Sequence, residues 1–266
     1  MKIGACGGIL GATYPIAKEL GFDYFETAFR DFSKMSEDEF QKCLETVKEV
    51  GLPVIRANGL FFNDQHFFGE GAMTEEEFKS LLEIGFERAS KVGVGTVVWG
   101  AGPTRKIPEG TDKDEAMKIV FRYGNFIADM AKKYGMKIVI EPLCRYETNV
   151  FNTVKDSCEF LKKLNRPEVK VLADSYHMMV ECEKYDTLGN YADMLIHAHI
   201  AEAKYDCKDI RLTPNMADEN NVKEFIYELK KMGYDGTVSI EAGLRSGDWK
   251  KDMTEGLEAI RKWANE

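Results

Sequence analysis

The sequence lacks the patterns that mark several protein classes. No run approaches the ~20 apolar residues that a membrane span requires. The first residues, MKIGACGGILGA, have neither the basic segment nor the uninterrupted apolar core of a secretion signal. None of the six cysteines forms a CxxC pair, which excludes zinc-finger and thioredoxin-like motifs. We therefore expect a cytoplasmic protein with reduced thiols and no membrane partner.

Positive charge is scarce as well. The chain carries 36 Lys and Arg residues against 45 Asp and Glu residues, which gives a net charge of −9. A surface that binds duplex DNA or RNA needs a basic stripe, so we expect no nucleic-acid partner. The chain also contains only four histidines, which is few for an enzyme that holds three zinc ions on imidazole ligands.

The sequence does contain a regular alternation of short apolar runs and longer amphipathic segments. The chain has 266 residues, 44% of them apolar, and no visible linker, so we treat residues 1–266 as one domain. The periodicity predicts strands at residues 2–6, 22–27, 53–58, 95–100, 136–141, 169–174, 194–200 and 237–241. It predicts helices at residues 13–20, 36–50, 74–92, 111–134, 153–164, 178–191, 219–232 and 249–264.

This alternation predicts the fold. Strands that alternate with helices form parallel sheets, and eight such units predict an α/β fold that closes into a (β/α)₈ TIM barrel. Gly21, Gly51, Gly135 and Gly233 follow the predicted helix ends, as C-terminal caps do. An open doubly wound sheet is the alternative, and it is disfavoured because no G-x-G-x-x-G motif follows the first strand.

Polar side chains end four successive predicted strands: Glu141 in KIVIEP, Asp174 in VKVLAD, His199 in LIHAH and Glu241 in TVSIE. Catalytic residues of such barrels come from the ends of several strands. Three carboxylates and one imidazole suit a single divalent metal ion, for which Mn²⁺, Co²⁺, Mg²⁺ and Zn²⁺ are the candidates. The competing interpretation is that the acidic residues only cap the helices that follow them.

The two glutamates of this set indicate a chemistry. With Asp174 and His199 on the strands between them, Glu141 and Glu241 are expected on opposite sides of the ion. Removal of a proton next to a carbonyl needs a base and a group that stabilises the enediolate charge. A second carboxylate on the other face returns a proton there and inverts the carbon, whereas a single base would move the carbonyl instead.

Several segments carry a resemblance to a known family: IEPLCRYETNVFNT, LADSYHM, HAHIAEA, SIEAG and VVWGAGPTRKIPEG. They resemble the ketose 3-epimerases that act on tagatose and allulose, within the xylose-isomerase-like barrels of sugar phosphate isomerases and epimerases. The resemblance implies a sugar substrate and a metal, usually Mn²⁺ or Co²⁺, held by the four strand-end residues. It implies that Glu141 and Glu241 exchange the C3 proton, and that Glu147 and His177 contact the substrate near O1 and O2.

One departure from the family leaves the sugar open. The family pattern H-x-G-E-x-N-R ends in an arginine that holds substrate oxygens, but here the residues are His199, Ile200, Ala201, Glu202, Ala203, Lys204 and Tyr205. Glu202 is kept, and Lys204 or Tyr205 is expected to supply a different substrate contact. Inosose dehydratases and hydroxypyruvate isomerases have the same metal set, so these activities remain alternatives. A homo-oligomer, either dimer or tetramer, is also expected.

Other residues carry two interpretations each. Trp99 ends the fourth strand and either stacks on a sugar or fills the barrel. Glu26 ends the second strand and either binds substrate or caps the next turn. His197 is interpreted as a hydrogen-bonded core histidine one layer below His199.

Two regions outside the strands carry open interpretations as well. Arg105 with Lys106, or Arg245, could bind a phosphate. The loop at 59–72 contains four phenylalanines, which either wall a sugar site as a lid or pack over the barrel or against a subunit.

Two further classes compete with the epimerase. An endonuclease IV-like nuclease would need more imidazoles and less negative charge than this chain has. A sugar-binding barrel without turnover would not need all four of the metal-type residues.

Overall fold

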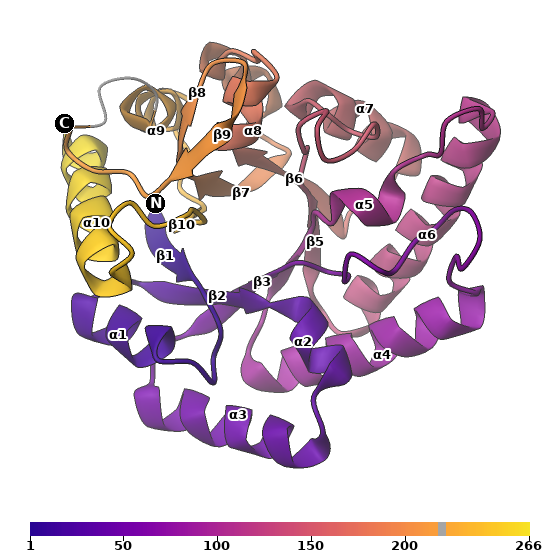
Figure 1. The fold of residues 1–266 in the computed structure, drawn as a ribbon, viewed down its shortest axis with the longest axis horizontal. Helices are drawn as coiled ribbons and strands as arrows, with labels where there is room; N and C mark the ends of the chain where they lie inside the picture. Colours follow the sequence, from indigo (N-terminus) through magenta and orange to yellow (C-terminus); the bar gives the residue numbers. More distant parts are fainter. Residues whose placement is uncertain (218–221) are drawn as a thin grey trace.

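A closed barrel of eight parallel strands forms the centre of the molecule, with helices in a ring around it (Figure 1). The structure is a computed structural model that describes residues 1–217 and 222–266. The strand order around the barrel is β1-β10-β7-β6-β5-β4-β3-β2, which confirms the predicted TIM barrel. The strands are β1 (Lys2–Cys6), β2 (Tyr24–Ala28), β3 (Val54–Asn58), β4 (Thr96–Trp99), β5 (Lys137–Ile140), β6 (Val169–Asp174), β7 (Leu195–Ile200) and β10 (Thr237–Ile240).

The helices follow the strands in sequence. They are α1 (Thr13–Leu20), α2 (Phe29–Lys34), α3 (Glu37–Val50), α4 (Glu75–Val92), α5 (Gly102–Arg105), α6 (Lys113–Lys133), α7 (Val154–Leu164), α8 (Ser175–Val180), α9 (Val222–Lys231) and α10 (Trp249–Asn265), with one 3₁₀ helix, η1 (Tyr185–Tyr191). The first residues of the helix predicted at 219–232 lie outside the described residues. In the described ranges, no helix combines the length and the apolar character needed to cross a membrane.

Local signals fix most helix ends. Ser36, Thr74 and Thr153 form reciprocal capping boxes with the residue three positions later, which satisfies free N–H groups at the starts of α3, α4 and α7. All four predicted cap glycines have positive φ, the conformation that ends a helix at low cost. These capping residues at the helix starts and ends explain why the predicted and observed helix boundaries agree closely.

The single helix predicted at 178–191 is wrong. The structure has α8, a short turn and then η1 in this region. Cys182 has a φ of 59°. Its backbone N–H donates a hydrogen bond to the carbonyl of Met179, and the N–H of Glu183 donates one to the carbonyl of Met178. This pair of bonds is a Schellman motif. A cysteine occupies the left-handed position that glycine usually holds, so the sequence gives no stop signal there.

The long loop predicted at 201–217 contains a β-hairpin. Strands β8 (Glu202–Lys204) and β9 (Cys207–Leu212) pair in antiparallel fashion, with an irregularity between Ala203 and Lys204. The hairpin rises beside β7 at the rim of the barrel (Figure 1). It also contacts α8, the helix that follows β6.

Inward side chains follow the strand period of two. Val98, Val139 and Leu172 form a separate apolar cluster inside the barrel, while Val97, Ile138 and Val171 belong to the large core between strands and helices. Two positions after Val139 and Leu172 come Glu141 and Asp174. The same alternation therefore places the strand-end residues in line with the barrel interior, at its C-terminal rim.

The loop at 59–72 packs mainly over the helix layer. Phe67 stacks on Tyr123 of α6 with 4.3 Å between ring centroids, and it also contacts Phe78 of α4. Phe61 packs on the same cluster and also borders the cavity at the barrel mouth. Packing on the helix layer therefore accounts for Phe67, while a lid role of this loop stays a prediction.

Arg105, at the end of α5, is fully buried and ties together the loops after β4 and β5. Its guanidinium donates hydrogen bonds to the backbone carbonyls of Trp99, Gly100, Glu141 and Val150, at 2.6 to 3.2 Å. Burial lowers the pKa of Arg105 to about 10, so it remains protonated at neutral pH. The interpretation of Arg105 as a phosphate ligand is wrong because its donors are committed to the backbone.

Replacing Arg105 should therefore destabilise the barrel strongly. Arg105→Met leaves four buried carbonyls without their donor, and each unsatisfied polar group costs about 1–3 kcal/mol. We expect the free energy of unfolding in urea to fall by about 3 kcal/mol or more. Arg122→Met is the control, since it removes only an exposed ion pair with Glu75 and should cost less than about 1 kcal/mol. Equal stability of the two variants would contradict this role.

Candidate metal centre and active site

The four strand-end residues converge at the rim of the barrel. Glu141, Asp174, His199 and Glu241 each offer one ligand atom, and these atoms lie within 4.8 Å of one another. They come from β5, β6, β7 and β10, which are adjacent in the barrel. Gly100 makes room for Glu141, because a Cβ at residue 100 would lie 2.4 Å from its Oε2. The predicted set is therefore brought together, and three of its members are buried.

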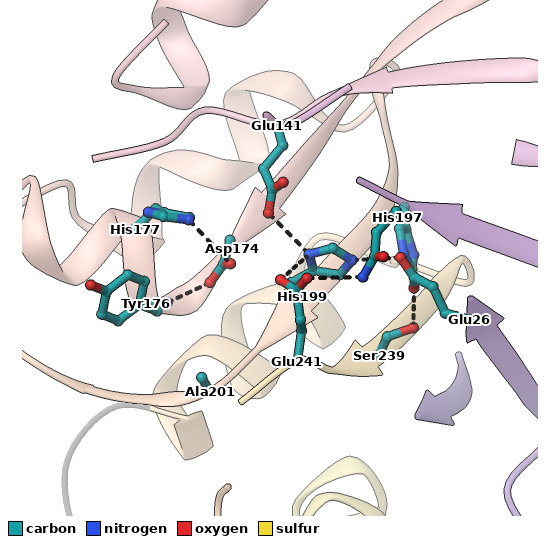
Figure 2. Close-up of polar contacts among 12 residues, drawn as sticks. Glu26, Glu141, Asp174, Tyr176, His177, His197, His199, Ala201, Ser239 and Glu241 are labelled. Atoms are coloured by element: carbon teal, nitrogen blue, oxygen red, sulfur yellow. Dashed lines mark hydrogen bonds and ion pairs between the residues drawn. The ribbon is translucent and has the colours of Figure 1, made fainter. Parts of the chain in front are cut away.

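His199 is the centre of this cluster. Its Nδ1 lies 3.0 Å from Oε1 of Glu141 and 3.0 Å from Oε2 of Glu241. Figure 2 shows the two glutamates converging on this nitrogen, Glu141 from above and Glu241 from below in this view. The other ring nitrogen, Nε2, lies 2.9 Å from Oε1 of Glu26. The imidazole thus turns one nitrogen to the ligand set and the other to a supporting carboxylate.

Glu26 connects the cluster to the barrel interior. This buried carboxylate also contacts Nε2 of His197 at 2.8 Å and accepts a hydrogen bond from Oγ of Ser239 at 2.5 Å. Nδ1 of His197 in turn contacts Oγ1 of Thr237 at 2.8 Å. The expected role of His197 as a hydrogen-bonded core histidine is confirmed. Glu26 does not cap a turn, and it is not among the described residues that line the cavity at the barrel mouth.

The charges in the cluster shift one another. Burial favours the neutral form of each group, but three carboxylates raise the pKa of His199 well above its usual range. His199 and His197 together lower the pKa of Glu26 well below its usual range, against the effect of burial. Burial raises the pKa of Asp174 to about 6, although Arg211 opposes the rise. The site therefore concentrates acidic groups, and the cationic groups that face them are His199 and Arg211.

A divalent cation fits this donor set. Carboxylate oxygens and an imidazole nitrogen within 4.8 Å of one another are the ligands that Mn²⁺, Mg²⁺, Co²⁺ or Zn²⁺ takes in proteins. The contact between Glu26 and His199 has the form that fixes the orientation of metal-ligating histidines. Such a cation would also favour the ionised form of the carboxylates around it.

A cavity of about 520 Å³ opens above the cluster. Glu141, Glu147, His177 and Glu241 all line it. Nδ1 of His177 accepts a hydrogen bond from the backbone N–H of Cys144 at 3.0 Å, so the ring proton of the neutral imidazole sits on Nε2. Burial keeps the pKa of His177 well below its usual range, and its Nε2 has no hydrogen-bond partner among the described residues. This nitrogen lies 3.8 Å from Oδ2 of Asp174 and 4.0 Å from Oε1 of Glu147, so its N–H is available for a further hydrogen bond.

Arg211 is the site residue that the sequence did not reveal. The hairpin carries it to the cluster, where Nη2 lies 3.0 Å from Oδ2 of Asp174 and 2.5 Å from Oε2 of Glu241. Its guanidinium also lies over the ring of Tyr176. Arg211 lines the cavity, as does Asn58, whose amide donates to Oε1 of Glu241 at 2.9 Å. The only available signal was an arginine downstream of the metal-type histidine, without a recognisable spacing.

Three predicted substrate contacts are not in the described lining of this cavity. Trp99 lies two positions after Val97 on the same strand, so it points outward from the barrel, as Val97 does. It packs on Phe151 and Phe160, between the strands and the helices. Glu202 is committed to an ion pair with Arg245, which also removes Arg245 as a phosphate ligand.

Lys204 is the third, and it is exposed on the hairpin, as its neighbour Tyr205 is. The hairpin turns these side chains to the surface while it directs Arg211 inward. The expectation that Lys204 or Tyr205 replaces the family arginine is therefore not met.

Comparisons with known proteins agree with this geometry. The chain matches 3-dehydro-D-guloside 4-epimerase of Escherichia coli (strain K12) at 26% identity, over 92% of this chain and 91% of the relative. It matches D-psicose 3-epimerase of Agrobacterium fabrum at 24% identity, over 86% of this chain and 78% of that protein. A crystal structure of a D-psicose 3-epimerase determined in the presence of D-fructose superposes with a TM-score of 0.81 and 22% identity, covering 100% of both chains.

The family itself follows from a match over nearly the whole chain. Residues 15–263 fit the model of the xylose isomerase-like TIM barrel. The chain belongs to this family.

Loss of either of two carboxylates should weaken metal binding. Glu141→Gln or Asp174→Asn replaces a charged ligand oxygen by a neutral amide, so we expect metal content after gel filtration to fall well below that of the wild-type protein. Elemental analysis of protein loaded with Mn²⁺ measures this directly. Glu147→Gln is the comparison variant, because Glu147 belongs to a different group of ligand-type residues, with Cys144 and His177, and should keep its metal if the ion lies at the four strand ends. Unchanged occupancy in both ligand variants would rule out this assignment.

The support that Glu26 gives to His199 should also be measurable. Loss of such an outer partner typically costs 10- to 100-fold in metal affinity. We expect Glu26→Gln to raise the dissociation constant for Mn²⁺ by about this factor while the four ligands stay in place. Electron paramagnetic resonance of free Mn²⁺ during a titration gives the constant, and circular dichroism checks the fold. Wild-type affinity in a folded variant would show that the contact has no such function.

Proposed function

We propose that the chain is a divalent-metal-dependent epimerase of a keto sugar. Glu141 and Glu241 act as the acid–base pair on the carbon next to the carbonyl, and the reaction passes through a cis-enediolate. The observation that carries this proposal is the approach of both glutamates, from β5 and β10, to Nδ1 of His199, at 3.0 Å each. In this proposal the reacting carbon lies between the two carboxylates, so that each of them reaches one of its faces.

Metal binding is part of the proposal. Glu141, Asp174, His199 and Glu241 would hold one divalent ion, with Mn²⁺ as the best candidate and Co²⁺, Mg²⁺ or Zn²⁺ as alternatives. When bound, the ion supplies Lewis-acid stabilisation of the negative charge on the substrate oxygens.

The remaining cavity residues position the sugar. The Nε2–H of His177 lacks a partner among the described residues and faces the cavity, so it donates to the carbonyl oxygen of the substrate. Glu147 accepts a hydrogen bond from an adjacent hydroxyl. Arg211 donates to substrate oxygens and limits the motion of Glu241, to which it is bonded. In this proposal Arg211 takes the part that Lys204 or Tyr205 was expected to take.

The relatives support the same class of reaction. Two of them are a 4-epimerase and a 3-epimerase of sugars by name, and both match most of this chain. Neither name decides which carbon this protein inverts. A putative hydroxypyruvate isomerase of Xenopus laevis matches 63% of this chain, so a one-base isomerase is the second candidate.

A nuclease with three zinc ions is not supported. Each candidate metal cluster among the described residues contains a single imidazole. A barrel that binds sugar without turnover remains to be separated by experiment, because the same residues would serve it.

Solvent exchange in D₂O separates these possibilities. A two-base epimerase incorporates one deuteron at the inverted carbon, and Glu241→Gln should lower turnover by at least about 10³-fold because an amide cannot carry the proton. In each single variant the remaining glutamate still reaches one face of the reacting carbon. We therefore expect Glu241→Gln to exchange the proton of one epimer without inversion, and Glu141→Gln that of the other. Nuclear magnetic resonance of both epimers follows the label.

Metal content must be measured in the same samples, since both residues also belong to the ligand set. Inversion at near wild-type rate by a metal-loaded Glu241→Gln variant would exclude the two-carboxylate mechanism. Movement of the carbonyl in place of inversion would favour the one-base isomerase. Absence of exchange with every keto sugar in metal-loaded wild-type protein would favour a binding protein.

A further inference from the structure

The cavity extends well beyond the ligand cluster. The ligands come from β5, β6, β7 and β10, which form one half of the barrel rim. The other half, after β1 to β4, is lined in part by residues with little or no side chain: Gly7, Gly8, Ala28, Gly59, Ala101 and Gly102. Where these small residues line the cavity, its wall is formed by backbone atoms. The cavity is therefore open on the side away from the proposed metal ligands.

The volume exceeds what one monosaccharide needs. A hexose has roughly 12 heavy atoms, and if each takes somewhat more than half of the ~30 Å³ of a liquid water molecule, the sugar fills roughly 200 Å³. The cavity holds about 520 Å³. More than half of it would remain for another part of the same substrate.

Polar groups border this extra space. Arg30, near the start of α2, lines it, and its Nη1 lies 2.8 Å from the position that a Cβ of residue 59 would occupy. Gly59 has a φ of 60°, a conformation that favours glycine, and its missing side chain leaves room for the end of Arg30. In residues 1–217 and 222–266, the Arg30 guanidinium has no hydrogen bond or ion pair with a side chain; it lies 5.5 Å from the ring of Phe62 and interacts electrostatically with Asp31. Its hydrogen-bond donors are therefore free for a ligand.

The charges on this half favour a neutral ligand over a phosphate. Asp31 follows Arg30 directly and also lines the cavity, and the two side chains interact electrostatically. Asn58 and Asn63 complete the polar lining, and both are uncharged. A cation with an adjacent anion and amides offers donors and acceptors together, as neighbouring hydroxyl groups require. A phosphate would meet the carboxylate of Asp31 as well as the guanidinium.

We propose that the half of the cavity after β1 to β4 is a second subsite that binds a sugar aglycone. The substrate is then a glycoside of the keto sugar, in which Arg30, Asp31 and Asn63 contact hydroxyl groups of the second unit while the keto unit lies at the cluster. This inference rests on the proposed function, because it takes the keto unit to be the one that reacts.

The test compares two glycosides of the same keto sugar. Methyl 3-dehydro-D-glucoside and 3-dehydro-D-glucose linked to a glucosyl unit are offered to Mn²⁺-loaded protein, and deuterium incorporation next to the carbonyl gives kcat/KM. We expect the glucosyl compound to be favoured by about 10-fold, the change that two hydrogen bonds of ordinary strength produce. D-psicose and its 6-phosphate serve as the free sugar and the anionic alternative.

Two variants locate the effect. Arg30→Ala removes the free donors, and Gly8→Phe fills the space, since an added Cβ at residue 8 meets no atom within 4 Å and needs no positive φ. Both should bring the ratio of kcat/KM between the two glycosides from about 10 to near 1. Lys34→Ala is the matched control, because Lys34 is a cation on the same helix that contacts Phe62 outside this cavity. It should leave the ratio as in the wild-type protein.

Equal kcat/KM for the two glycosides, or an unchanged ratio in both variants, would overturn the subsite. A preference for the 6-phosphate that disappears in Arg30→Ala would overturn it in favour of an anion site. Calorimetric binding of the glucosyl compound separates this result from failure of the proposed reaction. Binding that depends on Arg30 without any exchange would refute the epimerase and keep the subsite, whereas no binding would refute the subsite.

Discussion

The buried contact between one imidazole and three carboxylates is the constraint on which the rest of the structure depends. His199 lies between Glu141 and Glu241 on one nitrogen and Glu26 on the other. Buried carboxylates are costly unless a positive charge and hydrogen bonds compensate them. Among the described residues the compensation comes from His199 and Arg211, and the proposed metal on Nδ1 would replace the proton of His199 as the compensating charge. An active face that must hold this much charge needs rigid support, which the barrel supplies.

The barrel delivers this support through strand alternation. Every second residue faces the interior, so apolar residues such as Val139 and Leu172 pack below the site and their successors, Glu141 and Asp174, meet above it. Arg105 holds the loop backbone behind Glu141, and Gly100 leaves space for its carboxylate. The polar cluster is thus built on packed strands rather than on loops, which keeps its members within reach of one another.

The sequence predicted the barrel and the cluster well because both depend on local patterns. Short β-branched runs ending in a polar residue mark strand ends, and eight of them allow little besides a closed barrel. Arg211 could not be found in this way, because a hairpin with an irregular pairing sets its direction. Trp99 lies one position away from the inward-facing Val98, so its side chain points to the helices and not to the site. The end of α8 was missed because Cys182 adopts a conformation typical of glycine. These errors lie where tertiary contacts override local signals.

The most direct test of the central claim is an anomalous difference map from crystals of Mn²⁺-loaded protein, recorded at the manganese absorption edge. The account predicts one strong peak bounded by Glu141, Asp174, Nδ1 of His199 and Glu241. Two other groups of ligand-type residues offer alternative positions, namely Cys6 with Glu26 and His199, and Cys144 with Glu147 and His177. A peak at either of these groups, or a map without a peak at the four strand-end residues, would contradict the account.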